Sequence, residues 1–232
     1  MKVSSKTKYC VIIPAYNAAS YLDNLLLRLK KIVSAEDILV VDDGSIDDTF
    51  IIAERFEVGV IKHNRNLGKG AALRTAFNQM LKDDYEVAVT IDADLQHPPE
   101  LIPEFIAKIE DGADIAVGNR MHNISAMPLE RRVSNFLSTL ATSILAGEKI
   151  LDSQCGFRAI KRWVIQNAKL LCDKYQHESE MLIEAARMGA KIKFVNIPTI
   201  YNGNKSYFHP AIDTARFLSF LIMYYPQRWL RR

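Results

Sequence analysis

The chain has 232 residues, of which 49% are hydrophobic, so it can bury the core of one domain of ordinary size. Its formal net charge of +3 is small for this length and gives no support to a nucleic-acid partner. Its three cysteines are scattered without a CxxC pair, which argues against a disulfide framework and a thiolate zinc site and suits a reducing compartment.

Short apolar runs alternate with longer amphipathic segments along the first half of the chain. Strands are predicted at 9–14, 38–41, 59–63, 86–91 and 114–119, and helices at 20–33, 46–56, 67–82 and 99–112. Apolar strands separated by amphipathic helices are typical of a mostly parallel open sheet with helices on both faces. The predicted fold class is therefore α/β.

The pattern loosens in the second half. Helices are predicted at 128–147 and 179–189, a loop or short strand at 152–162, and a last strand at 191–198. No internal repeat or Pro/Gly-rich linker divides the chain, which predicts a single domain over 1–232 with an elaborated C-terminal half. No signal peptide and no run of about 18 to 20 apolar residues is found, so we expect a protein that is soluble or bound at a membrane surface.

Polar clusters follow the first, second and fourth predicted strands, where ligands bind in open parallel sheets. Asp92 and Asp94 are separated by one residue and repel each other unless a cation lies between them. With Gln96 they form a set of hard oxygen donors suited to Mg²⁺ or Mn²⁺. A loop with solvated acids is the alternative, and a second acid pair at another strand end, Asp42 and Asp43, favours the metal.

Four segments in order carry a resemblance to a known family: VIIPAYNAASYL, VVDDGSIDDT, NLGKGAALRTAF and IDADLQHPPEL. They resemble family 2 glycosyltransferases of the GT-A fold, and among these the polyprenyl-phosphate and dolichyl-phosphate sugar synthases, including the dolichyl-phosphate mannose synthases. The likeness is strong over 10–120 and weaker through DSQCGFRAIKR and HESEMLIEAARMGAKI. It implies a nucleotide-sugar half at 1–120, an acceptor half at 121–209 and a candidate membrane-interfacial helix at 210–232.

The resemblance also implies roles for single residues. The nucleotide sugar would be lined by Pro14, Tyr16, Asn17, Asp42, Asp43 and Asp92, with Asp43 accepting hydrogen bonds from the base. Asp92, Asp94 and Gln96 would hold the divalent cation. Arg120 would meet the diphosphate or the sugar, and Asp152 would face the acceptor. The predicted catalytic residues are Asp94, Arg120, Asp152 and Arg158.

Family 2 enzymes invert the anomeric centre in one displacement, so the metal and an arginine would stabilise the leaving nucleoside diphosphate. A phosphate acceptor is already an anion and needs cations rather than a general base. The candidates are Arg131, Arg132, Arg158, Lys161 and Lys205, of which Arg131, Arg158 and Lys205 are favoured. Glu178 and Glu180 stand where relatives with hydroxyl acceptors carry an acidic base motif, but the sequence HESE departs from that motif and favours phosphate.

The predicted partners are a nucleoside diphosphate sugar, GDP-mannose or UDP-glucose, and a lipid-linked phosphate, with no nucleic acid. Mannose is favoured because DADLQHPPE is similar to the mannosyl-phosphate synthases. The apolar run 217–225 between two arginines suits an interfacial helix or a closing core helix, and predicts a peripheral protein at the cytoplasmic face of a membrane. The alternatives are transfer to a hydroxyl, a processive polysaccharide synthase, a nucleotidyltransferase and an inactive nucleotide-sugar binding protein.

Overall fold

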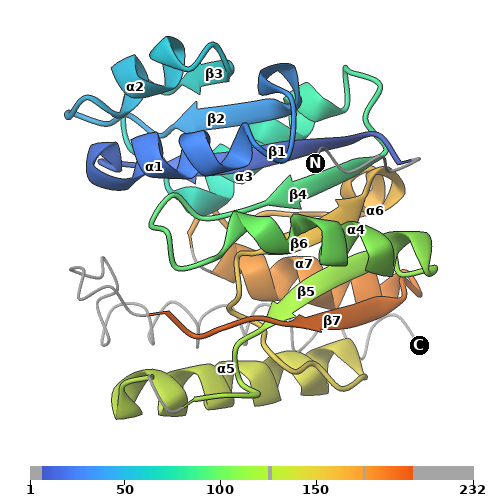
Figure 1. Cartoon of the computed structure of the whole chain (residues 1–232). Coiled ribbons are helices and arrows are strands. Elements are labelled where there is room, and N and C mark those ends of the chain that lie inside the picture. The colour runs from blue at the N-terminus through green and yellow to red at the C-terminus, as the bar shows by residue number, and fades with distance from the viewer. Residues whose placement is uncertain (1–6, 125–126, 175, 201–232) are drawn as a thin grey trace.

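Each strand predicted from the first half of the sequence forms, and all of them join one sheet (Figure 1). The computed structural model describes residues 7–124, 127–174 and 176–200. Its strands are β1 (Tyr9–Ala15), β2 (Ile38–Asp42), β3 (Gly59–Lys62), β4 (Val87–Thr90), β5 (Ile115–Asn119), β6 (Arg158–Lys161) and β7 (Ile192–Asn196). The order across the seven-stranded sheet is β3-β2-β1-β4-β6-β5-β7.

Strand β6 is the antiparallel member of this sheet. It lies between β4 and β5 and runs against both of them, while the other neighbouring pairs are parallel. The sequence left residues 152–162 open as a loop or a short strand, and the structure makes Arg158–Lys161 a strand at the centre of the sheet. The loop before β6 is thereby brought close to the end of β4.

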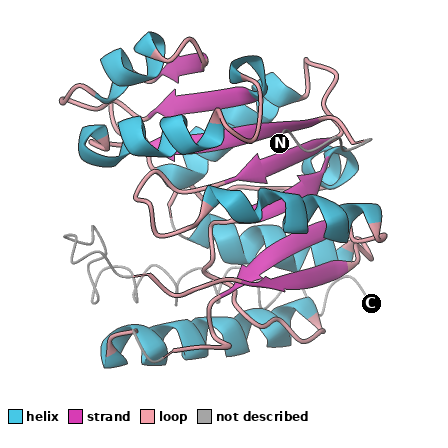
Figure 2. Ribbon diagram, in the orientation of Figure 1, coloured by secondary structure: helices cyan, strands magenta, loops and turns pink. Residues whose placement is uncertain are grey.

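Helices cover both faces of the sheet (Figure 2). They are α1 (Ala19–Leu29), α2 (Thr49–Arg55), α3 (Lys69–Met80), α4 (Ile102–Glu110), α5 (Leu129–Ala146), α6 (Arg162–Asn167) and α7 (Gln176–Arg187). In Figure 1, α1 and α4 lie in front of the sheet, α3 and α7 lie behind it, and α5 lies along the lower edge against α7. The predicted α/β fold with two covered faces is confirmed.

The strands are buried because helices pack on both of their faces. All residues of β2, β4 and β5 are buried, which accounts for their nearly continuous apolar sequences. Helix α1 follows the usual amphipathic pattern and turns four leucines inward: Leu22, Leu25, Leu26 and Leu29. Among the described residues, no helix has the length and apolar character needed to cross a membrane.

Candidate active site

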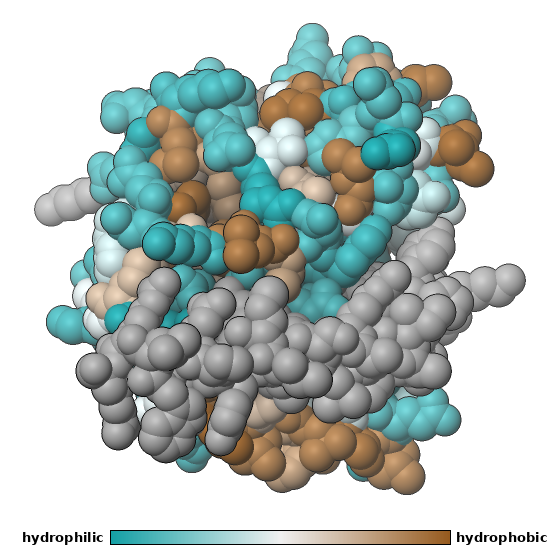
Figure 3. Space-filling view, turned by 180° about the vertical axis from the view of Figure 1, so that it is seen from behind, coloured by the Kyte–Doolittle hydropathy of each residue, from teal (hydrophilic) through white to brown (hydrophobic). Residues whose placement is uncertain are grey.

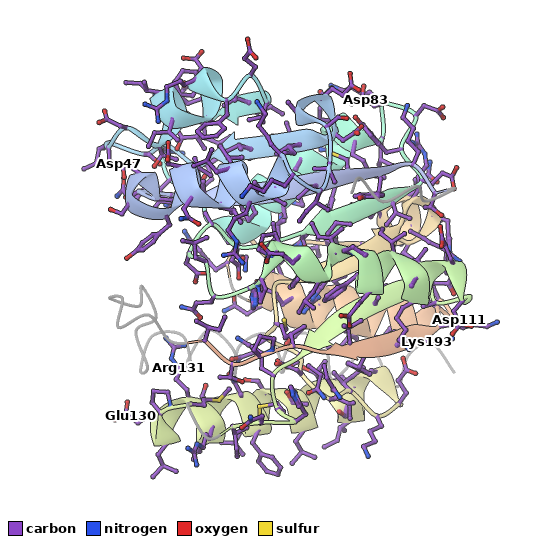
Figure 4. All side chains as sticks on the ribbon, in the orientation of Figure 1. Asp47, Asp83, Asp111, Glu130, Arg131 and Lys193 are labelled. Carbon is purple, nitrogen blue, oxygen red and sulfur yellow. The ribbon has the colours of Figure 1, made fainter. Side chains whose placement is uncertain are left out.

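The predicted site residues come from loops that follow strands at one edge of the sheet. Strands β2 and β4 both pair in parallel with β1, so their carboxyl ends lie at the same edge. Figure 4 shows this edge at the left, where Asp47 is labelled, while Asp83, Asp111 and Lys193 lie at the opposite edge. Glu130 and Arg131, at the start of α5, are also on the left.

Asn17 joins the loop after β1 to the loop after β2. Its backbone N–H donates to Ser45 Oγ over 2.9 Å, and its side-chain Oδ1 accepts from Ile46 N over 3.0 Å. Asn17 adopts a φ of 49°, a left-handed conformation that asparagine tolerates better than most residues. Pro14, near the end of β1, and Tyr16, directly after this strand, are both half-buried. The structure therefore brings together the residues predicted to line a nucleotide.

The two acids of the DDGS segment have different environments. Asp43 accepts hydrogen bonds from Leu67 N at 2.9 Å and Gly68 N at 2.7 Å, and its Oδ1 lies 2.7 Å from His63 Nδ1. Asp42 is fully buried, and its Oδ2 has no hydrogen-bond partner among the described residues. Because buried carboxylate oxygens are normally paired, Asp42 is the better candidate to accept a bond from a ligand. Asp43 anchors the 67–68 loop, and its predicted role towards the base stays a prediction.

Lys69 lies between two carboxylates at the centre of the site. Its Nζ is 2.5 Å from Asp92 Oδ1 and 2.7 Å from Glu178 Oε1. Burial alone would lower the pKa of Lys69, but the charges of Asp92 and Glu178 raise it above its ordinary value. Burial would likewise raise the pKa of Asp92, but Lys69 and His97, whose Nε2 is 3.6 Å away, hold it well below the usual range. The site therefore contains a fixed ion pair.

Lys69 and His97 were not singled out from the sequence. Lys69 is the first residue of α3, where a positive charge opposes the helix dipole and is disfavoured. The signal for Lys69 in the sequence is its position between two glycines at the start of a predicted helix. A positive charge at that end of a helix is stabilised only if carboxylates from other parts of the fold lie beside it. His97 follows the DADLQ segment directly and is 2% exposed, with its ring against Phe157.

Gly156 is the point where the loop before β6 meets this ion pair. A Cβ atom at this position would lie 2.6 Å from Asp92 Oδ2 and 2.7 Å from Lys69 Nζ, closer than real Cβ contacts allow. The absence of a side chain is therefore a condition for Asp92 and Lys69 to meet. This explains why the segment DSQCGF has glycine here.

Asp94 and Gln96 are in the turn after β4, both half-buried. The N–H of Gln96 donates to Asp94 Oδ1 over 3.0 Å, and Leu95 between them has a φ of 59°. Burial first, and the negative charge of Asp92 second, raise the pKa of Asp94. A cation beside both carboxylates would relieve that repulsion.

A divalent cation fits this donor set. Two carboxylates and one amide oxygen are the ligands that Mg²⁺ and Mn²⁺ prefer. The described residues contain no cluster of three or more His, Cys, Asp or Glu side chains arranged for a metal, so any metal would rely on Gln96 or on oxygens of a bound substrate. Such a shared site is common for Mg²⁺ that binds with phosphates.

Arg120 and Asp152 form a pair that the sequence analysis had assigned to separate roles. Arg120 donates from Nε and Nη2 to the two oxygens of Asp152 over 2.8 and 3.0 Å, and its backbone N–H donates as well. Burial would raise the pKa of Asp152, but Arg120 keeps it below its usual value. Asp152 is fully buried and orients Arg120 at the end of β5, and its predicted place facing the acceptor stays a prediction.

Arg158, which was predicted to act in catalysis and to bind the acceptor phosphate, is occupied by backbone partners in this structure, and both roles stay predictions. It is 3% exposed, and it donates to the carbonyls of Cys155, Glu178 and Ser153 over 2.8, 2.7 and 2.9 Å. Its guanidinium therefore ties the 153–155 loop to α7. Burial lowers the pKa of Arg158 from its ordinary value.

The other candidate cations are placed differently. Lys161 pairs with Asp114 at 3.1 Å, at the opposite edge of the sheet, so it is not part of this site. Lys205 and the run 217–225 lie outside the described residues. Arg132 donates to the carbonyl of Met127 over 2.7 Å in the first turn of α5. Arg131, beside it, lies on the left of Figure 4, on the side of the carboxyl edge of the sheet, and its predicted contact with the acceptor phosphate stays a prediction.

Glu178 and Glu180 are both buried on α7 and engaged within the protein. Glu180 accepts from the backbone N–H groups of Leu171 and Cys172, each over 2.9 Å. Glu178 pairs with Lys69, while its Oε2 has no partner among the described residues. Glu180 is thus committed to holding a loop, and neither acid is an exposed general base.

His177, buried on α7, gives a prediction for stability against pH. It is 2% exposed and stacked on Phe77, and burial together with the charge of Arg158 lowers its pKa from 6.5 to about 3. Below about pH 6.5, His177 binds a proton in the unfolded chain but stays neutral in the folded chain. The free energy of unfolding therefore falls as the pH drops towards 3, by at most about 1.4 kcal/mol per pH unit.

Replacing His177 by Phe removes this titration, so the variant should lose less stability than the native chain between pH 6.5 and 4. Urea unfolding at several pH values measures the difference. The matched control is His122→Gln, which removes an exposed imidazole and should follow the native curve. Parallel curves for native and His177→Phe would contradict a neutral buried His177.

Comparisons with known proteins agree with this geometry. Residues 10–168 match the family described as Glycosyl transferase family 2. The UDP-N-acetylglucosamine–dolichyl-phosphate N-acetylglucosaminyltransferase of Methanococcus voltae is 33% identical, with 82% of this chain and 85% of that protein covered. The dolichol-phosphate mannosyltransferase of Pyrococcus furiosus is 32% identical over 82% of this chain and 55% of its own length.

Solved structures show the same fold at lower sequence similarity. The glucosyl-3-phosphoglycerate synthase of Mycobacterium tuberculosis superposes with a TM-score of 0.74 at 20% identity, covering 96% of this chain and 81% of that one. Structures of that synthase were also solved with Mn²⁺ and UDP-glucose, and with Mg²⁺ and UDP. At this identity the likeness concerns the fold.

Proposed function

This chain belongs to glycosyl transferase family 2, and from that membership and the site we propose that it transfers a sugar from a nucleoside diphosphate to a polyprenyl or dolichyl phosphate. The observation that carries the proposal is the carboxylate pair Asp92 and Asp94 at the end of β4, beside Lys69. Both relatives described above are named for lipid-phosphate acceptors.

The loops after β1 and β2 would hold the nucleotide. Pro14, Tyr16 and Asn17 line one side, and the free oxygen of buried Asp42 accepts a hydrogen bond from the base. Asp43 acts indirectly, because it fixes the loop that carries Lys69. A buried acceptor without a partner favours a ligand N–H at this position, since an unsatisfied carboxylate oxygen costs free energy.

Asp92, Asp94 and Gln96 would hold Mg²⁺ or Mn²⁺ together with diphosphate oxygens. When bound, the metal would supply positive charge to the leaving group. Arg120, oriented by Asp152, and Lys69, held by Asp92 and Glu178, supply fixed positive charge from the protein. Charges that are already in place need no reorganisation as the diphosphate leaves, which is the electrostatic form of catalysis.

A phosphate acceptor needs no general base, and the two acids on α7, Glu178 and Glu180, are both engaged with other groups of the protein. The acceptor oxygen attacks the anomeric carbon, the bond from that carbon to the diphosphate breaks, and the electron pair leaves with the nucleoside diphosphate. A hydroxyl acceptor would lose a proton to a nearby base, but Glu180 is bound to two backbone N–H groups. Arg131, which Figure 4 shows on the side of the carboxyl edge of the sheet, would attract the acceptor phosphate.

The sugar is the finer part of the proposal. We keep mannose as the favoured hexose, with glucose as the second choice, and the N-acetylglucosaminyl relative adds a third donor to be tested. An enzyme with a lipid-linked acceptor also has to work at a membrane surface, so we propose peripheral association on the cytoplasmic side. No nucleic acid is involved.

The test incubates the purified chain with Mn²⁺, a short polyprenyl phosphate and one radiolabelled donor at a time: GDP-mannose, UDP-glucose or UDP-N-acetylglucosamine. Label should enter the organic phase from one donor and should stop when a chelator is added, because Asp92 and Asp94 then repel each other at the diphosphate site. A donor hydrolysed or transferred only to hydroxyl acceptors would refute the lipid-phosphate acceptor. Transfer that persists with chelator would refute the metal.

A further inference from the structure

Helix α5 carries its large apolar side chains on the outside of the molecule. Six of the eleven exposed large apolar residues among the described ones belong to this helix. They are Leu129, Val133, Phe136, Leu137, Leu140 and Ile144, with exposed fractions of 72, 52, 59, 56, 48 and 52%. Figure 3 shows the resulting brown surface along the lower edge of the molecule, where α5 lies. We call these six residues the outer face of α5.

The inner side of the same helix is mostly polar. Asn135, Ser138 and Thr142 are buried there, with Leu145 near the C-terminal end packed against Ile183. Ser138 Oγ accepts from Gln154 Nε2 over 2.8 Å, and Thr142 Oγ1 donates to Ser179 Oγ over 3.1 Å. A surface helix normally turns its apolar side to the core and its polar side to water. Most of α5 is reversed, so the six apolar residues of its outer face do not serve the core of this chain.

A contiguous apolar face of this kind marks a place where another apolar body binds. The sequence between Arg132 and Glu148 contains no charged residue, so nothing interrupts the outer face along the helix. Charges occur only at the two ends: Glu130, Arg131 and Arg132 at the start, and Glu148 and Lys149 beyond the end. An uncharged apolar face with charged residues only at its two ends is typical of a helix that lies in the interface of a bilayer.

The start of α5 is at the same edge of the molecule as the site loops. Figure 4 shows Arg131 on the side of Asp47, away from Asp111 and Lys193. Adjacent arginines at that end match the negative charge of acidic lipid headgroups. A bilayer in contact with the outer face would therefore present its headgroups, and any phosphate among them, next to the carboxyl edge of the sheet.

We propose that the outer face of α5 docks on the surface of a lipid bilayer and so holds the carboxyl edge of the sheet at the headgroup layer. The part of this inference that concerns the acceptor rests on the proposed function, whereas the docking itself does not. The favourable free energy comes from apolar side chains leaving water, and Arg131 and Arg132 add attraction to anionic lipid.

The test measures sedimentation of the full chain with vesicles of phosphatidylcholine and phosphatidylglycerol, without donor or acceptor. The native chain should sediment with the vesicles. The double variant Phe136→Gln, Leu140→Gln should partition at least about tenfold more weakly, because two large apolar side chains no longer gain from leaving water. Both residues are more than 45% exposed, at 59 and 48%, so thermal unfolding in buffer should stay native.

The matched control changes two apolar helix residues of similar exposure away from α5: Ile51→Gln and Leu27→Gln, which are 60 and 52% exposed. This variant should bind vesicles like the native chain. Equal vesicle binding by the two double variants would overturn the proposal. The proposal would also be overturned if the native chain does not bind vesicles but forms a dimer, and the α5 double variant is a monomer. The latter result would assign the outer face to a second copy of the chain.

A second measurement separates docking from transfer. Phe136→Trp should show a blue shift of its added tryptophan emission on mixing with vesicles, and Ile51→Trp should not. In a transfer assay, the double α5 variant should keep native activity on a short polyprenyl phosphate in detergent and lose it on acceptor embedded in vesicles. Vesicle binding without any sugar transfer would support the docking and refute the proposed function. Sugar transfer without vesicle binding would refute the docking and support the proposed function.

Discussion

Replacing Asp94 by Asn is expected to reduce sugar transfer by at least about a hundredfold while the protein stays as stable as the native chain. Asn retains an oxygen that can accept from Gln96 N, so the turn after β4 is preserved. The native carboxylate is strained electrostatically, because burial and the charge of Asp92 both raise its pKa. Its removal should therefore cost no stability, although it removes a negative ligand from the cation.

Two readouts check this expectation: initial rates with saturating Mn²⁺, and calorimetric titration of Mn²⁺ in the presence of nucleoside diphosphate. In Asp94→Asn, both sugar transfer and Mn²⁺ binding should be lost, while the free energy of unfolding in urea stays at the native value or rises slightly. The control is Asp111→Asn, which removes an exposed carboxylate paired with Lys193 at the opposite edge of the sheet (Figure 4). Native transfer by Asp94→Asn would remove the metal site from the proposed function.

Replacing Arg158 by Lys should destabilise the fold by about 3 to 5 kcal/mol. The guanidinium donates to three separate backbone carbonyls, and one ammonium group cannot reach all of them in that geometry. The carbonyls left without donors are buried between the 153–155 loop and α7, where an unsatisfied acceptor is costly. The midpoint of thermal unfolding should drop by roughly 10 °C.

The control for Arg158 is Arg28→Lys, an exchange in an ion pair with Glu100 whose side chains are 32 and 54% exposed. Exposed pairs contribute at most about 1 kcal/mol, so this variant should unfold close to the native midpoint. From its sequence position, Arg158 is predicted to bind the acceptor phosphate. A stable Arg158→Lys variant with a raised KM for the acceptor alone would restore that role and contradict the structural one.

Much of the site was predictable because short segments carry it. Asp92, Asp94 and Gln96 lie just after the end of β4, and Pro14, Tyr16 and Asn17 lie at or just after the end of β1, so strand ends and local spacing predict where they are. Their roles as ligands remain predictions. What each acid contacts was less predictable: Asp42 and Asp43 are neighbours in sequence, yet one keeps an unpaired buried oxygen and the other holds the 67–68 loop.

The sequence by itself determined the class of the fold and most of its strands and helices in chain order, because apolar periodicity and turn residues act over a few positions. The tertiary structure alone decided which distant groups meet. Lys69 meets Asp92 and Glu178, Arg120 meets Asp152 from 32 positions away, and the insertion of β6 between β4 and β5 allows it. These contacts are strong because the groups are buried: a charge that is removed from water loses its hydration and is stable only beside a group of opposite charge.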